Sequence, residues 1–185
     1  MTFEEFRDLC EDAAKQFRHL IPVPWDEEAF IANLSRLRGR PITLGFYTPT
    51  GGAPCGMYLG TGQGDRLLLP SNIGGGYQRR HVLFHEIGHW WFDFDQAEHA
   101  AVEPDLLEWV KAFLDIDPET IEFALGRHGY DVPIERRAET LAHVLGDLVT
   151  ELEAESEKPA TTPEQAGIIA RLHGSLGRPD RKQQF

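Results

Sequence analysis

The stretch VLFHEIGHWW, residues 82–91, lies near the middle of the 185-residue chain and decides how the rest of it is interpreted. Its apolar residues recur at the spacing of a buried helix, which we expect over residues 78–94. Because a helix turns by about 100° per residue, His85 and His89 lie on one face about one turn apart. Both imidazoles can therefore reach a single metal ion.

This His-Glu-x-x-His pattern is typical of zinc hydrolases. Zinc lowers the pKa of a bound water from 15.7 to roughly 7, and Glu86 stands beside the ion without ligating it, so its carboxylate can accept the proton. A chain with 8 histidines would match the pattern by chance roughly 0.03 times. We therefore predict peptide hydrolysis with Zn²⁺ as the cofactor and Glu86 as the general base.

The composition, with 41% hydrophobic and 26% charged residues, predicts one globular domain over residues 1–158. A linker, a short helix and a polar tail are expected over 159–185. The net charge of −12 argues against binding to nucleic acid or an anionic membrane, which favours a protein or peptide partner. Cys10 and Cys55 are too few for a disulfide framework, and the sequence contains no apolar signal or membrane-spanning run, so we expect a cytoplasmic protein.

The expected fold class is α+β, mostly helical, with a small three-stranded sheet packed beside the helix that carries the histidines. Strand-like runs occupy 42–47, 56–60 and 66–69. Apart from the motif helix, helical patterns cover the ranges 3–19, 26–38, 105–114, 118–126, 133–155 and 163–173.

A catalytic zinc normally takes three protein ligands, so a third must be found. Asp95 could serve only if the chain turned sharply at position 92, and Phe92 disfavours that turn. A carboxylate on a later helix is the other route. Glu135 can bind the ion while Glu139, one turn later, orients a ligating histidine, and the small Ala138 between them lets the two helices approach closely.

These residues resemble the ImmA/IrrE family of zinc metallopeptidases. The similarity is carried by the His85–His89 motif, by Glu135-Arg136-Arg137-Ala138-Glu139 and by Arg38-Gly39-Arg40-Pro41-Ile42, and it covers residues 21–149, with the first helix over 1–20 lying outside it. It implies a minimal gluzincin-like fold in which His85, His89 and Glu135 bind zinc. It also implies that the substrate is a helix-turn-helix repressor or an antitoxin-like regulator involved in transcription or stress responses.

The segment 90–134 is longer than the family pattern leads one to expect, and it leaves other ligands open. Glu139 is the first alternative to Glu135, and manganese or iron could replace zinc at a site of this type. Four further candidates fall within or beside the segment: Glu98, His99, Glu103 and Glu108.

Other polar residues near the motif receive lesser roles. His81 and Asp93 extend the row of polar side chains on the helix, but one tetrahedral ion cannot be reached from three successive turns. We therefore expect His81 at the rim of the cleft or facing solvent, and Asp93 at a helix end or on the surface. A donor to the oxyanion is also needed. Its candidates are His128, Tyr130 and His143.

Three hypotheses about function follow. The first is a zinc endopeptidase whose peptide substrate adds a strand to the edge formed by Asp65–Leu69. The second is a regulatory binding module that retains the metallopeptidase fold without catalysis. The third is a structural protein of a phage or mobile element that holds no metal.

Overall fold

The computed structural model describes residues 3–49, 56–98, 102, 104–114, 116–125 and 132–157. The chain divides into two units, Met1–Glu153 and Ala154–Phe185, and the description below concerns the first of them. The helix and tail predicted within 159–185 lie outside the described residues.

The fold is α+β and mostly helical, as predicted. Its elements are α1 (Phe3–Phe17), α2 (Glu27–Arg38), β1 (Ile42–Tyr47), β2 (Met57–Thr61), β3 (Gly64–Pro70), α3 (Tyr77–Glu98), α4 (Pro104–Phe113), a 3₁₀ turn (Pro118–Thr120), β4 (Ile121–Leu125) and α5 (Val132–Glu157).

The ends of the helices follow local sequence signals. Asp26 caps α2 by accepting a hydrogen bond from the backbone N–H of Ala29, and Gly39 ends the helix in the left-handed conformation at φ 74°. The motif helix α3 continues without a break to Glu98, so the sharp turn at Phe92 that Asp95 would have needed does not occur.

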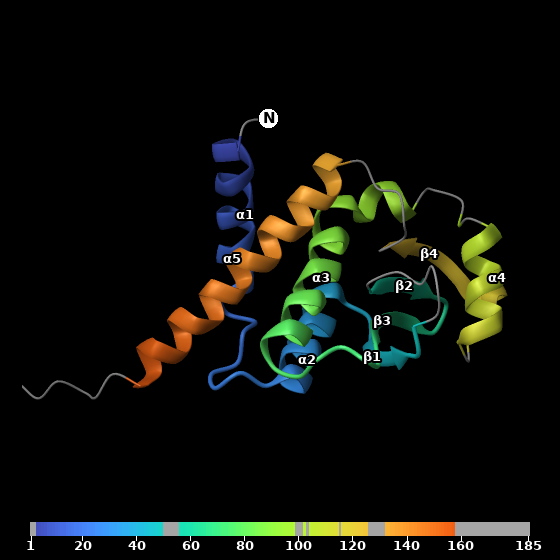
Figure 1. Cartoon of the computed structure of the whole chain (residues 1–185), viewed down its shortest axis with the longest axis horizontal. Helices are drawn as coiled ribbons and strands as arrows, with labels where there is room; N and C mark the ends of the chain where they lie inside the picture. The colour runs from blue at the N-terminus through green and yellow to red at the C-terminus, as the bar shows by residue number, and fades with distance from the viewer. Residues whose placement is uncertain are drawn as a thin grey trace, which may run out of the picture. The chain divides into compact units, whose positions relative to one another are not determined.

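The sheet has four strands in the order β1-β3-β2-β4, rather than the three that were predicted (Figure 1). β1 is parallel to β3, while β2 is antiparallel to both β3 and β4. The fourth strand replaces a helix predicted over 118–126. Asp117 does cap the 3₁₀ turn, but the next residues alternate between the two faces of the sheet and pair with β2, and this pairing overrides their helical pattern.

This strand order also shows that the expected edge at Asp65–Leu69 was wrong. Those residues belong to β3, which is paired on both sides. Among the described strands, the two edges of the sheet are β1 and β4.

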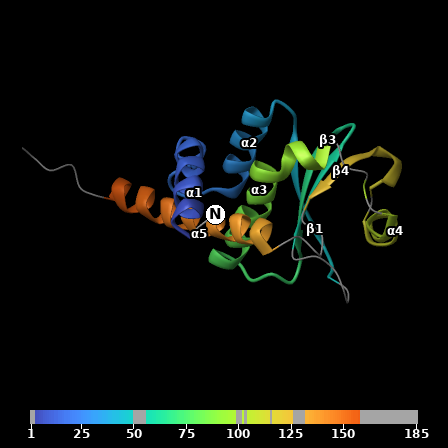
Figure 2. The ribbon, with the colours of Figure 1, turned by 90° about the horizontal axis from the view of Figure 1, so that it is seen from above.

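The first unit is layered (Figure 2). Helices α1 and α5 lie together, α3 and α2 lie between them and the sheet, and α4 covers the opposite face of the sheet. The face toward α3 contributes side chains such as Tyr58, Leu67 and Phe123 to the main core. The opposite face packs Met57 and its neighbours against Val110 of α4.

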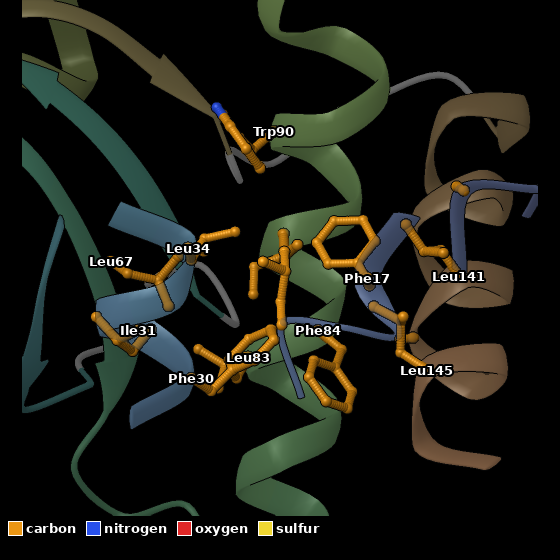
Figure 3. Packing of buried hydrophobic residues seen from close by; sticks show 14 of the residues in the cluster. Phe17, Phe30, Ile31, Leu34, Leu67, Leu83, Phe84, Trp90, Leu141 and Leu145 are labelled. Atoms are coloured by element: carbon orange, nitrogen blue, oxygen red, sulfur yellow. The ribbon is translucent and has the colours of Figure 1, made fainter. Parts of the chain in front are cut away.

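Helix α3 passes through the main core and is covered on both sides (Figure 3). Leu83 faces Ile31 of α2, while Phe17 and Leu141 cover the other side of the helix. Cys10 is buried in the same core, as expected for a small apolar residue, and Cys55 lies outside the described residues. This enclosure makes α3 a rigid support for the side chains that it carries.

A buried charge network fixes the sheet against α2 and α3. Asp65 is fully buried and forms ion pairs with Arg38 and Arg40, while the hydroxyl of Tyr58 donates a hydrogen bond to it at 2.9 Å. Burial, followed by the charge of Asp65, raises the pKa of Tyr58, so its hydroxyl stays protonated. The Tyr58 ring stacks on Trp90, with centroids 5.9 Å apart, which ties β2 to the residue beside His89.

Candidate metal centre

The structure brings His85, His89 and Glu135 together, although 45 residues of chain lie between His89 and Glu135. Nε2 of His85 lies 3.1 Å from Nε2 of His89. The Glu135 carboxylate lies 3.5 Å from Nε2 of His85 and 3.7 Å from Nε2 of His89. The same nitrogen of each ring therefore faces one carboxylate.

These distances fit a tetrahedral ion. Zn–N distances of about 2.0–2.1 Å place two nitrogen ligands roughly 3.3–3.4 Å apart, and a carboxylate oxygen is held at a similar separation. Two imidazoles and one carboxylate also form the donor set of many catalytic zinc sites. The three residues thus suit zinc in both chemistry and spacing.

Close contact between α3 and α5 makes this convergence possible. A Cβ atom built on Gly88 would lie 2.7 Å from Cα of Ala138, closer than real Cβ atoms come. Ala138 and Ala142 are both buried, as expected for small residues at a helix crossing. Gly88 stands between the two histidines, and Ala138 stands between Glu135 and Glu139, so the tightest contact lies beside the ligands.

Each histidine has a carboxylate on its other nitrogen. Oε2 of Glu139 lies 3.3 Å from Nδ1 of His85, which is the orienting position predicted for this residue. Oδ2 of Asp93 lies 3.5 Å from Nδ1 of His89, and Arg137 donates to Oδ1 of the same carboxylate at 2.5 Å. The contact of Glu139 is a hydrogen bond, whereas that of Asp93 is an ion-pair distance only. Both carboxylates stand beside Nδ1 and leave Nε2 as the metal-binding nitrogen.

Asp93 was expected at the surface, and that prediction was wrong. Its side chain is only 5% exposed, because Arg137 reaches across from α5 and neutralises its charge. An ion pair between two helices overrides the tendency of an acidic residue to stay in water. Asp93 belongs to the support of His89.

The side chain of Glu86 is buried beside the histidines, with the residue 1% exposed. It lies against the backbone of Gly56, where a Cβ atom would come within 2.6 Å of Oε1. Oε2 has no hydrogen-bond partner among the described residues. Burial, followed by the negative charge of Glu135, raises the pKa of Glu86 well above its usual value. Such a carboxyl group takes up a proton more readily than an ordinary glutamate does.

The charge states of the neighbouring groups also favour metal binding. Burial and then the charge of His89 lower the pKa of His85, so its imidazole is neutral and able to bind a metal. Burial acts to raise the pKa of Glu139, but attraction and hydrogen bonding from His81, with further attraction from His85 and His143, outweigh it and lower that pKa. Glu139 is therefore ionised.

The remaining candidates do not join this group or lie outside the described residues. Glu108 is exposed on α4, across the sheet from α3 (Figure 2). His143 is 58% exposed and contacts Glu139. The placement of the following side chains is not described: Asp95, Glu98, His99, Glu103, His128 and Tyr130.

Sequence reasoning missed Arg137, Gly56 and the role of Asp93. The helical spacing held a signal for the first and last of these, since Asp93 follows His89 by four residues and Arg137 lies between Glu135 and Glu139. Gly56 carries no such signal, because its contact with Glu86 depends on how the sheet docks against α3.

None of the described helices is long and apolar enough to cross a membrane. No protein-family model, curated protein or solved structure matches the chain. The case for its function therefore depends on the site itself.

Proposed function

We propose that this protein is a zinc-dependent endopeptidase. The observation that carries the proposal is the convergence of His85, His89 and Glu135 on one point beside the buried carboxyl group of Glu86. Two imidazoles with a carboxylate are a common zinc-binding set, and a nearby proton acceptor is what hydrolysis additionally requires.

In this proposal His85, His89 and Glu135 hold the ion, which when bound polarises the scissile carbonyl and makes water more acidic. Glu86 accepts a proton from the attacking water on its carboxylate and passes it to the leaving amine. The raised pKa of Glu86 suits both halves of that transfer. Glu139 and Asp93 keep the two imidazoles oriented, and Gly56 leaves room for the Glu86 carboxylate.

The resemblance to the ImmA/IrrE family supports a gluzincin-like fold and a regulatory protein as substrate. A helix-turn-helix repressor or an antitoxin-like protein is the substrate class that the family implies. The net charge of −12 fits a protein partner better than a nucleic acid.

The test is to measure zinc content and cleavage for the wild type, Glu86→Gln and the surface control Glu4→Gln. A peptide library made from a digested proteome, read by mass spectrometry for new termini, requires no known substrate. We expect the wild type and the control to bind zinc and cleave. Glu86→Gln should retain zinc and lose activity by on the order of 10²–10⁴-fold, because the proton acceptor is gone.

A regulatory binding module that retains the fold is the second hypothesis, favoured only by the resemblance to a family of regulators. It predicts that Glu86→Gln leaves the biological output unchanged. Cleavage by Glu86→Gln at the wild-type rate would overturn the peptidase proposal, as would purified wild-type protein that binds no zinc. The latter result would favour the structural role.

A further inference from the structure

A second group of metal-binding side chains lies one helical turn from the first. It consists of His81 on α3 with Glu139 and His143 on α5, and one ligand atom from each residue lies within 4.8 Å of the others. His81 precedes His85 by four residues, and His143 follows Glu139 by four. The two helices therefore present this second group along the same face as the first.

The Glu139 carboxylate is the centre of the group. Nε2 of His81 lies 3.1 Å from one of its oxygens and 3.2 Å from the other, and Nδ1 of His143 lies 3.5 Å from Oε1. The two imidazole rings meet edge to face with centroids 4.8 Å apart. On its other side, His81 stacks against Tyr77. The three side chains are thus gathered by contacts among themselves and with Tyr77.

The chemistry of these donors favours zinc. Two imidazoles and a carboxylate suit a borderline-soft divalent ion, whereas magnesium and calcium prefer oxygen ligands. Nδ1 of His143 donates a hydrogen bond to the backbone oxygen of Glu139 at 2.9 Å. In a neutral imidazole with that bond, Nε2 is the nitrogen left to bind a metal.

Exposure distinguishes this group from the first one. The side chains of His81, Glu139 and His143 are 21%, 49% and 58% exposed, while those of His85, Glu135 and His89 are 17%, 44% and 1% exposed. The difference therefore lies in the second histidine, His143 against His89. Water competes for exposed ligands, and their rotamers are less restricted, so an ion held here exchanges more readily with solvent.

Glu139 also belongs to the first site, since its Oε2 lies 3.3 Å from Nδ1 of His85. We propose that His81, Glu139 and His143 form a second, weaker zinc site that is coupled to the first through Glu139. The second site stands independently of any peptidase activity, while its coupling rests on zinc binding at the first site. A zinc ion on Glu139 would compete with His85 for this carboxylate, so filling one site weakens the other.

The experiment is equilibrium dialysis of metal-free protein against buffered free zinc, with bound metal counted by mass spectrometry. The wild type should bind one zinc tightly and a second at higher free zinc. The double substitution His81→Ala/His143→Ala should abolish only the weaker step. A matched control is His19→Ala, which removes another exposed histidine and should leave both steps unchanged.

Substitutions in the first group provide the reverse test. His89→Ala and Glu135→Gln should each remove the tight step and keep the weak one, and circular dichroism checks that each variant folds. A wild type that stops at one tightly bound zinc which His81→Ala/His143→Ala retains, or a second step that survives this double substitution, would overturn the second site. A single zinc that is lost with His81 and His143 but retained in His89→Ala would support the second site while contradicting the proposed function.

The coupling between the two sites is tested by the zinc affinity of the second site when the first site is empty. In His89→Ala and in Glu135→Gln, where the first ion is absent, the second site should bind zinc roughly fivefold or more tightly than it does in the wild type. An unchanged affinity in both variants would show that the two sites are independent and would overturn the coupling.

Discussion

Two groups of histidine and glutamate side chains lie on the same pair of helices, and they differ mainly in what surrounds them. The group of His85, His89 and Glu135 has the close contact of Gly88 with Ala138 beside it and a carboxylate behind each imidazole. The group centred on Glu139 has one half-buried and one exposed histidine, and no second carboxylate is among the described contacts of these histidines. Similar donors are thus closely supported by neighbouring residues in one place and less so in the other.

The comparison indicates that packing around the donors, more than the kind of donor, distinguishes the two candidate sites. In a closely packed site the ligand side chains lose their conformational entropy during folding, so their geometry is fixed before the ion binds. An exposed site orders its ligands only when the ion binds. Each of the following predictions alters one support of the buried group while leaving His81 and His143 unchanged as an internal control.

Gly88→Ala should have the largest effect. The added methyl group meets the backbone of Ala138, which cannot move without separating α3 from α5. We expect the free energy of unfolding, measured with urea, to fall by about 1–3 kcal/mol, and the tight zinc step to weaken.

Gly146→Ala is a matched control, because its new methyl group would lie 4.0 Å from the Tyr77 ring, an ordinary contact. Greater helix propensity should make that variant about 1 kcal/mol more stable. Equal stability changes in the two variants would mean that the helix contact at Gly88 is not tight.

Asp93→Asn should have the next largest effect. Without the charge, the side chain holds the His89 ring less firmly and pairs less well with Arg137. Affinity for zinc at the tight step should fall roughly 10–100-fold, as is typical when a residue that orients a metal ligand is changed. Competition with a chromophoric chelator measures it. Asp147→Asn changes an exposed residue of α5 and should leave the zinc affinity unchanged. Equal zinc affinities in Asp93→Asn and Asp147→Asn would show that Asp93 does not support the site.

The smallest of these effects should be that of Glu86→Gln on the stability of the metal-free protein, and this effect should depend on pH. The pKa of Glu86 is raised well above 4.5 by burial and by Glu135, so the protonated form stabilises the fold below pH 4.5. That contribution is lost as the pH rises through the raised pKa, because the buried group must then ionise. Near neutral pH, Glu86→Gln should be more stable than the wild type by on the order of 1 kcal/mol.

Thermal unfolding of both proteins across this pH range measures the difference. Bound zinc should reduce this difference in stability, because its positive charge favours the ionised form of Glu86. Parallel curves for the two metal-free proteins would show that Glu86 does not ionise within a buried environment.

Much of the buried group could be predicted because it depends on helical spacing. His85 and His89 share a face by periodicity alone, and Glu135 and Glu139 do so as well, so pairing the two helices was enough to place four side chains. The small residue Ala138 indicated where the helices would cross. These are local signals, which a single sequence carries.

The rest depended on tertiary contacts that spacing does not encode. Ile121–Leu125 became a strand because β2 offered an edge for pairing, and Asp93 became buried because Arg137 reached it from another helix. The prediction that Asp65–Leu69 forms an edge failed for the same reason, since strand order cannot be read from a strand's own residues.

The contact between Gly88 and Ala138 has a consequence for the conditions under which the centre keeps its shape. Neither residue carries an ionisable group, so the helix spacing they set does not depend on charge screening. Added salt should therefore weaken the exposed pairing of His81 with Glu139 well before it disturbs the buried histidines. The arrangement of His85, His89 and Glu135 should therefore persist across large changes in ionic strength.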